Sequence, residues 1–320
     1  MYCAEFNYSA LKDILFINNL KLHLYITRMN AFTIKDLENL SGIKAHTIRI
    51  WEQRYSFLKP QRTQTNIRYY SNDELKTVLD IALLNKYGYK ISHIDKMSAI
   101  EVREKIGSLS HAQAQQERLI NDLLQCMVDL NIDKFEDIMD SFIASKGIDK
   151  AISYLIFPFL DKLGILWLTN HVNPAQEHLV TNIIRQKLVV GIESVVSHVV
   201  VDKTVILFLP EGEHHELGLL YMYYLLKSRG VRVLYLGSSV PIRDLEFVSK
   251  LKKPDYLYTH LTCVAGNFNI DKFLMQMLQR LPGVPLVISG QLAPSQLKKI
   301  PPEINFKHSL SEMLEFVAAL

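Results

Sequence analysis

The sequence predicts a multidomain protein that is helical in its first half, apart from a short strand segment, and α/β in its second half. Two amphipathic helices separated by a Gly-containing turn follow residue 32, and residues 110–198 have helical patterning throughout. From Lys203 onward, apolar strands alternate with helices, which is typical of a doubly wound parallel sheet. With 320 residues, the chain is long enough for two or three domains.

The composition favours a globular, cytoplasmic protein. Hydrophobic residues make up 48% of the chain and charged residues 22%, and the net charge of +3 is too small to indicate a partner by itself. The cysteines are far apart and never in a C-x-x-C spacing, which argues against a disulfide framework or a structural zinc site. These cysteines are Cys3, Cys126 and Cys263.

The chain shows no pattern of a membrane span or signal peptide. Its most apolar stretch, residues 151–168, is interrupted by Pro158, Asp161 and Lys162, which suits a buried helix pair better than lipid. Charged residues precede any apolar run at the N-terminus. Residues 1–29 are therefore treated as an extension of unknown role, and no membrane partner is expected.

The first domain, residues 30–100, has the pattern of a helix-turn-helix. Ile34, Leu37 and Leu40 lie on one face of a short helix, Ser41 and Gly42 make a break, and a second helix follows. A short Gly-containing turn between two such helices is the helix-turn-helix plan.

The segment after these helices predicts a basic β-wing. Lys59-Pro60 prevents helix continuation, and residues 67–69 alternate as a strand does. Six cations stand between residues 44 and 70 against one acid, Glu52, and such a surface suits DNA phosphates. A solvated charged loop is the alternative, but the wing coincides with the helix-turn-helix, which favours double-stranded DNA. The six cations are Lys44, Arg49, Arg54, Lys59, Arg62 and Arg68.

The stretches "TIRIWEQRY", "LKPQRT" and "IRYYS" resemble the winged-helix domain of MerR-type transcriptional regulators, over residues 32–98. The resemblance implies a homo-oligomer, dimer or higher, that reads a promoter palindrome. Metal sensing is disfavoured because no paired cysteines follow this domain. The DNA contacts that the resemblance implies are Thr33, Thr47, Arg49, Arg54, Tyr55, Arg62, Asn66, Arg68 and Tyr69.

Residues 110–198 predict a four-helix bundle with short connections. Within it, Trp167, Glu177 and His178 taken singly are typical of a core residue and a capped helix end. Together, their Trp-x9-Glu-His spacing resembles the helical domain of cobalamin-dependent regulators, such as the light- and cobalamin-responsive MerR repressors. That resemblance implies that these three residues face the upper side of a corrin ring.

Residues 200–320 predict a Rossmann-like sheet domain with strands at 205–209, 231–236, 256–261 and 286–289. Helices are expected from Glu216, Pro241, Asn269 and Leu292. The stretch "EGEHHELG" follows the first strand, at the sheet edge where ligands bind. A polar loop, a metal site and a cofactor site are the alternatives. No G-x-G-x-x-G and no P-loop occur, and a zinc hydrolase would need a third ligand.

The Glu-x-His-x-x-Gly of this loop is similar to the Asp-x-His-x-x-Gly motif of cobalamin-binding domains. The resemblance implies that His215 ligates cobalt, Glu213 orients it, Gly218 lets the backbone approach the nucleotide tail, and His214 is a bystander. It also aligns Thr259 and Leu261 with a Ser-x-Leu motif, and Gly290-Gln291 with a Gly-Gly pair. Glu for Asp, Thr for Ser and above all Gln291 depart from the family pattern.

These observations predict a non-enzymatic, MerR-type DNA-binding regulator. Its C-terminal half would sense a cobalamin, with adenosylcobalamin favoured, and control oligomerisation and operator binding. A light-receptor role is a further expectation, with His178 or His171 as the upper histidine. One alternative is a regulator with a vestigial, cofactor-free sensor used for oligomerisation or protein partners. Another is the corrinoid carrier of a methyltransferase, which the basic wing opposes.

Overall fold

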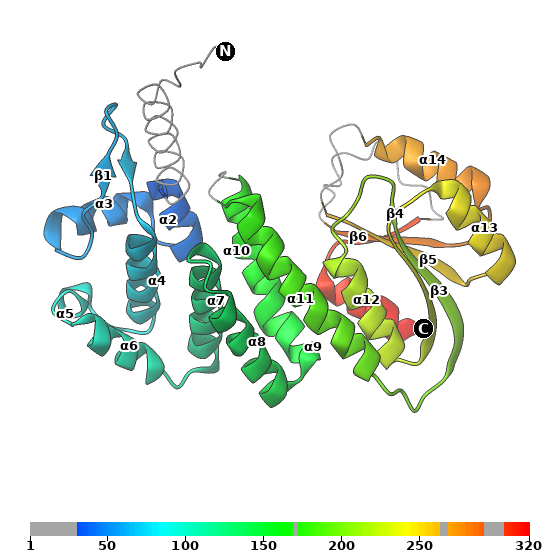
Figure 1. Ribbon diagram of the computed structural model, residues 1–320, viewed down its shortest axis with the longest axis horizontal. Helices are drawn as coiled ribbons and strands as arrows, with labels where there is room; N and C mark the ends of the chain where they lie inside the picture. The colour runs from blue at the N-terminus through cyan, green and yellow to red at the C-terminus, as the bar shows by residue number, and fades with distance from the viewer. Residues whose placement is uncertain (1–30, 169–171, 263–267, 291–303) are drawn as a thin grey trace, which may run out of the picture. The chain divides into compact units, whose positions relative to one another are not determined.

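The structure is a computed structural model that describes residues 31–168, 172–262, 268–290 and 304–320 (Figure 1). The chain divides into two compact units, Met1–Val180 and Thr181–Leu320, and each is described by itself. The predictions about the N-terminal extension, Cys3, Cys263, His171, Gln291 and the helix from Leu292 lie outside the described residues. Within those residues, no helix is long and apolar enough to cross a membrane.

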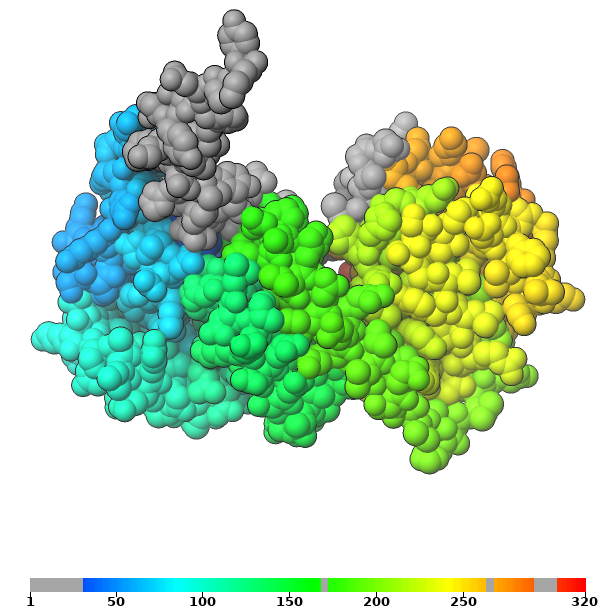
Figure 2. Space-filling model, viewed as in Figure 1, coloured from blue at the N-terminus to red at the C-terminus, as the bar shows by residue number. Residues whose placement is uncertain are grey.

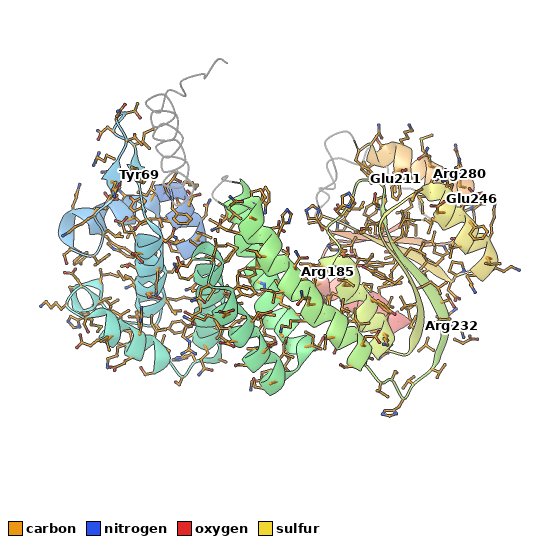
Figure 3. All side chains as sticks on the ribbon, in the orientation of Figure 1. Tyr69, Arg185, Glu211, Arg232, Glu246 and Arg280 are labelled. Carbon is orange, nitrogen blue, oxygen red and sulfur yellow. The ribbon has the colours of Figure 1, made fainter. Side chains whose placement is uncertain are left out.

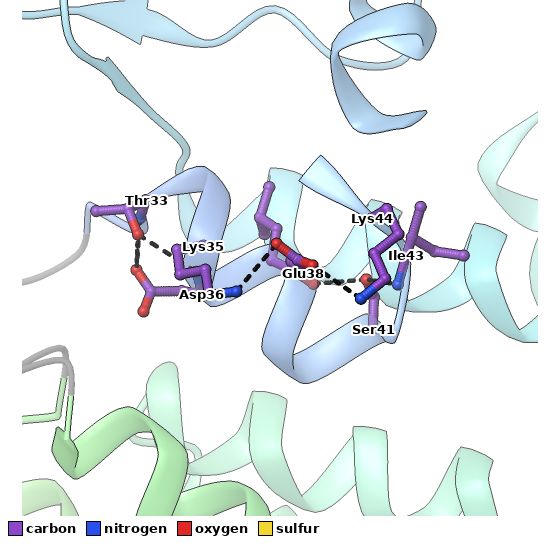
Figure 4. A network of polar contacts seen from close by, with 8 residues as sticks. Thr33, Lys35, Asp36, Glu38, Ser41, Ile43 and Lys44 are labelled. Atoms are coloured by element: carbon purple, nitrogen blue, oxygen red, sulfur yellow. Dashed lines mark hydrogen bonds and ion pairs between the residues drawn. The ribbon is translucent and has the colours of Figure 1, made fainter. Parts of the chain in front are cut away.

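The first unit opens with the helix-turn-helix, α2 (Ile34–Ser41) and α3 (Ala45–Arg54). Thr33 caps α2 in a capping box with Asp36 (Figure 4). Gly42 ends the helix with φ of 76°, a conformation that favours glycine. Apolar side chains from α2 and α3, each at most 4% exposed, pack against one another, and this burial fixes the relative orientation of the two helices. These residues are Leu37, Leu40, Ile48 and Trp51.

A two-stranded wing follows the helix pair. Strands β1 (Gln61–Arg62) and β2 (Arg68–Tyr69) are antiparallel, with Arg62 opposite Arg68, and Asn66 adopts φ of 63° in the turn. Phe32 and Tyr70 form a β-bridge that attaches the base of the wing to the start of α2. Helices α4 (Asn72–Lys86), α5 (Ile91–Ile94) and α6 (Ala99–Gly107) complete this part.

The helical bundle consists of α7 (Ala112–Val128), α8 (Ile132–Lys146), α9 (Ile148–Ala151), α10 (Phe157–Leu168) and α11 (Pro174–Ser194). A π-helical segment, Ile152–Ile156, joins α9 to α10. It ends two residues before Pro158, which has no N–H for the carbonyl of Tyr154. The Gln116 side chain donates to that carbonyl instead, at 2.7 Å. The predicted helix pair is therefore one irregular helix, and four helical rods form the bundle.

On the face in view in Figure 2, the atoms of α7, α8 and α10 form a continuous surface. Lys162 is a partly buried cation of this bundle. The Lys162 Nζ atom of α10 donates to Asn121 Oδ1 of α7 at 2.7 Å, and burial lowers the pKa of Lys162 to about 8. The charged ammonium is therefore disfavoured in the folded state.

Replacement of Lys162 should show the energetic cost of burying its ammonium group as a change in the pH dependence of stability. Its folded pKa lies below its unfolded value, so the unfolded chain binds more protons between about pH 8 and 10.5, and stability rises with pH there. The free energy of unfolding of Lys162→Met minus that of wild type should therefore fall between pH 7 and 10, measured by urea unfolding. A difference that is constant with pH would contradict the assignment of the buried charge to Lys162.

The second unit is a five-stranded parallel sheet, which confirms the predicted doubly wound fold. Its strands are β3 (Val201–Pro210), β4 (Val231–Val240), β5 (Tyr256–Leu261), β6 (Leu286–Gly290) and β7 (Ile304–Lys307). The strand order is β4-β3-β5-β6-β7. Sequence patterning predicted the first four strands and missed β7, which is short and polar.

Helices cover both faces of this sheet (Figure 1). Helices α12 (Leu217–Ser228) and α15 (Leu310–Ala319) pack on one face, in a core that contains Tyr258. Helices α13 (Ile242–Lys252) and α14 (Ile270–Arg280) pack on the other, in a core that contains Leu257 and Leu261. The ion pair of Glu246 with Arg280, at 3.0 Å, joins α13 to α14 (Figure 3).

Candidate functional site

The loop after β3 holds a histidine on a buried carboxylate. Glu213 is 1% exposed, and its Oε1 atom lies 2.7 Å from His215 Nδ1. The same oxygen accepts from the backbone N–H groups of His214 and His215, both at 2.9 Å. The other oxygen, Oε2, accepts from the N–H of Thr262 at 3.2 Å. Glu213 therefore fixes the loop to the end of β5 and orients the His215 ring at the same time.

This arrangement suits ligation of a metal by His215. A proton on Nδ1, shared with the carboxylate, leaves the imidazole lone pair on Nε2, and 53% of the side chain is exposed. Among the residues that the structure describes, no group of three or more His, Cys, Asp or Glu side chains could hold a metal ion. A single oriented imidazole therefore fits a metal that arrives with other ligands in place, as cobalt does in a corrin ring.

Glu216, which the sequence predicted only as the start of a helix, anchors the same loop. Its carboxylate accepts from Arg185 of α11 at 2.5 Å and from the hydroxyl of Tyr235 of β4 at 2.8 Å. The Tyr235 ring stacks on Tyr223 of α12, with centroids 5.4 Å apart. Burial raises the pKa of Tyr235, so the phenol remains a hydrogen-bond donor. The loop is thereby held from two further elements of the second unit.

Gly218, in the first turn of α12, lies against a second histidine. A Cβ atom at Gly218 would come within 2.4 Å of the His260 ring, so only glycine allows this approach. The His260 Nδ1 atom lies 2.7 Å from Ser289 Oγ, which is 2.5 Å from the Tyr258 hydroxyl. Burial lowers the pKa of His260 to about 4, against the opposing effect of Glu213, so its imidazole is neutral.

The residues aligned with the Ser-x-Leu motif lie on the opposite face of the sheet. Leu257 and Leu261 of β5 belong to the core under α13 and α14, and strand alternation puts Thr259 on that side. Among the residues that the structure describes, the buried Thr259 hydroxyl has no hydrogen-bond partner. Gly290, at the end of β6, has φ of 114°, and a Cβ atom there would lie 2.0 Å from the Leu261 carbonyl oxygen. Strand alternation places His260 on the face of β5 opposite Leu257, and this sequence signal could have identified His260 as a residue of the α12 side.

The residues with the Trp-x9-Glu-His spacing lie at the end of α10 and the start of α11. Trp167 is 43% exposed, which is unusual for the side chain of a core tryptophan. The His178 Nδ1 atom lies 3.1 Å from Glu177, and 70% of the His178 side chain is exposed. The structure thus brings Glu177 and His178 together and presents Trp167 and His178 at the surface of their own unit.

The expected DNA contacts fall into two groups. Arg49 and Arg54 of α3, with Arg62 and Asn66 of the wing, are exposed, and Thr47, Tyr55 and Tyr69 are half-buried. Arg62 donates to Asn66 Oδ1 at 2.7 Å in the wing turn.

Two of the expected contacts pair with acidic side chains of the same domain. Arg68 donates to Glu52 at 2.8 Å, and Thr33 bonds Asp36 as the cap of α2. Glu52, counted in the sequence only as the single acid, also accepts from the Tyr70 hydroxyl and so joins α3 to the wing.

Comparison with known proteins gives family matches for the helix-turn-helix domain and for the helical bundle. Residues 32–99 match the family model of MerR HTH family regulatory proteins, and residues 119–190 match that of the B12 binding domain. The chain thus combines a MerR-type helix-turn-helix domain with a B12-binding domain, the domain pair of a MerR-type regulator with a cobalamin-binding region.

Two relatives from Myxococcus xanthus are similar to most of the chain. HTH-type transcriptional repressor CarH is 28% identical over 275 residues, which cover 83% of this chain and 90% of that protein. HTH-type transcriptional repressor CarA is 27% identical over 270 residues, covering 83% and 89%. Among solved structures, the Methanosarcina barkeri monomethylamine corrinoid protein has a TM-score of 0.49 at 13% identity, covering 64% of this chain and all of that one.

Proposed function

We propose that this protein is a cytoplasmic, non-enzymatic transcriptional repressor of the MerR type whose binding to a promoter palindrome is set by a bound cobalamin. The Glu213–His215 pair carries the proposal, because a buried carboxylate at 2.7 Å from Nδ1 prepares Nε2 as a ligand. The order of family matches along the chain and the repressor names of both relatives support it.

The adenosyl form of cobalamin is the proposed signal, and light is the proposed second input. When bound, the cobalt–carbon bond of that form supplies a light-sensitive group. His215 would ligate the cobalt, with Glu213 keeping the proton on Nδ1. The exposed side chains of Trp167 and His178, with Glu177 on the His178 ring, are further proposed corrinoid contacts.

DNA binding is proposed for the exposed side of α3 and the wing. Two copies related by a dyad would place two such surfaces on one palindrome, so we propose a homodimer or a larger oligomer on DNA. The wing has no use in a corrinoid carrier of a methyltransferase. We therefore propose that residues 30–100 bind DNA, residues 110–198 cap the corrinoid and residues 200–320 ligate it.

Retention of a corrinoid separates this proposal from a cofactor-free regulator. Purified protein is incubated with adenosylcobalamin in the dark, passed over a desalting column, and examined by absorbance before and after illumination. The proposal predicts about one retained corrinoid per chain, with a histidine-ligated spectrum that changes on illumination. Folded protein that binds DNA and retains no corrinoid would favour the vestigial sensor.

Substitutions of two arginines test the DNA-binding surface. Arg49→Ala in α3 should weaken specific binding by tenfold or more, since one good base contact contributes about 1–3 kcal/mol. Arg62→Ala in the wing should lower the slope of log affinity against log salt concentration by about one, as expected for a lost phosphate contact. Fluorescence anisotropy on an operator duplex measures both. Lys146→Ala, in the helical bundle, is the control, and unchanged binding in both arginine variants would refute this surface.

A further inference from the structure

A crevice for ligands is expected beside the His215 loop. The strand order β4-β3-β5 reverses direction at β3, because the chain leaves β3 for β4 on one side and returns to β5 on the other. In such sheets the carboxyl ends of the strands on either side of this point form a crevice, here between β3 and β5. The bond from the Thr262 N–H of the β5 end to Glu213 of the β3 loop spans the mouth of this crevice.

The side of the crevice under α12 is filled by an aromatic cluster. The His260 ring lies so close to Gly218 that no Cβ atom would fit between them. The ring is held at 2.7 Å by the Ser289 hydroxyl, and Tyr258, which is fully buried, holds that hydroxyl from the other side. Two hydrogen-bonded side chains, Ser289 of β6 and Tyr258 of β5, therefore hold the imidazole in place.

The filled crevice matters for the kind of corrinoid that His215 would accept. A complete cobalamin carries a benzimidazole base on a nucleotide tail, and this base occupies the cobalt face that His215 would take. Once displaced, the base needs a seat near His215 or remains in solvent with no compensating contacts. A benzimidazole is larger than the imidazole of His260, so it cannot enter the crevice while that ring is there.

We propose that His260 is a specificity-determining residue that fills the crevice behind Gly218, so that the site favours corrinoids without a nucleotide base over complete cobalamins. This inference rests on the proposed function, since it presupposes that His215 binds a corrinoid. It deepens that function by ranking the corrinoids at this site: cobinamides fit the crevice as the structure shows it, whereas a complete cobalamin would bind more weakly, with its base outside the crevice.

A matched pair of ligands tests this specificity. Adenosylcobalamin and adenosylcobinamide differ only in the nucleotide tail, and their affinities for the full chain can be measured by absorbance titration in the dark. Wild type should bind adenosylcobinamide at least tenfold more tightly. His260→Ser, which empties the crevice, should raise the affinity for adenosylcobalamin at least tenfold and change that for adenosylcobinamide less than threefold.

Two further variants separate the effect of the ring's volume from that of its hydrogen bond. His260→Leu keeps the crevice filled without an imidazole and should behave as wild type. Ser289→Ala removes only the hydrogen bond that holds the ring, so it should also raise the affinity for adenosylcobalamin, but by a smaller factor. Circular dichroism shows whether each variant folds. If His260→Ser does not fold, Ser289→Ala still tests the role of the ring.

The outcomes separate this inference from the proposed function. If the protein binds corrinoids but neither His260→Ser nor Ser289→Ala changes the ratio of the two affinities, the role of His260 is overturned. The proposed function would still stand. Failure of the folded wild type and its variants to bind either corrinoid would overturn the proposed function, and this inference with it.

Discussion

His215→Ala should lower the affinity for adenosylcobalamin at least a hundredfold, or leave a bound corrinoid whose spectrum lacks histidine ligation. The imidazole is the proposed protein ligand of the cobalt, and it is already oriented by the Glu213 carboxylate at 2.7 Å. A loss of this size corresponds to about 2.7 kcal/mol or more, which is reasonable for a single metal–ligand bond. Absorbance titration in the dark measures both the affinity and the ligation state.

Neighbouring substitutions provide the controls. His214 contributes its backbone N–H to Glu213, and alanine keeps that N–H. The His214 side chain is exposed, so His214→Ala should leave binding within threefold of wild type. Glu213→Gln should weaken binding about tenfold to a hundredfold, as the loss of an orienting carboxylate generally does. Equal effects of His214→Ala and His215→Ala would contradict the assignment of the ligand.

Glu52→Ala should destabilise the first domain by about 2–4 kcal/mol. The Glu52 side chain is 9% exposed and accepts from Arg68 at 2.8 Å and from the Tyr70 hydroxyl. Its removal leaves a partly buried guanidinium and a buried phenol without their acceptor. The wing should also lose its fixed orientation on α3, so operator affinity should fall with stability. Urea unfolding followed by circular dichroism gives the free energy change.

Lys35→Ala is the matched control within the same domain. Lys35 forms an ion pair with Glu38 at 3.2 Å, but 65% of its side chain is exposed, so its loss should change stability by less than about 0.5 kcal/mol. If Glu52→Ala had an effect as small as this, Glu52 would not be the residue that joins α3 to the wing.

The helix-turn-helix and the doubly wound sheet were predictable because their signals are local and repeated. Leu37, Leu40, Ile48 and Trp51 form one buried face, and the predicted strands carry continuous apolar runs. Strand β7 was missed because four residues with the sequence "INFK" have no apolar run, and only pairing with β6 makes them a strand. The irregular helix before Pro158 likewise depends on Gln116, from a distant part of the chain.

The candidate site was predictable in its local part only. The spacing of Glu213 and His215 sufficed to expect their contact, since both lie in one short loop. The cluster around His260 depends on which face of β5 each residue occupies and on a glycine 42 positions earlier in the chain. Charge alone likewise could not show that Arg68 is bound by Glu52, because the pairing requires the wing to fold back onto α3.

The central claim is that one chain couples a corrinoid to DNA, and operator affinity measured with and without adenosylcobalamin tests it most directly. Anisotropy titrations of an operator duplex are made in the dark at saturating ligand, then repeated after illumination, with wild type and His215→Ala. The account predicts that adenosylcobalamin changes the operator affinity of wild type at least tenfold, that light reverses the change, and that His215→Ala does not respond. An operator affinity of wild type that is the same in all three conditions, with the corrinoid bound, would contradict it.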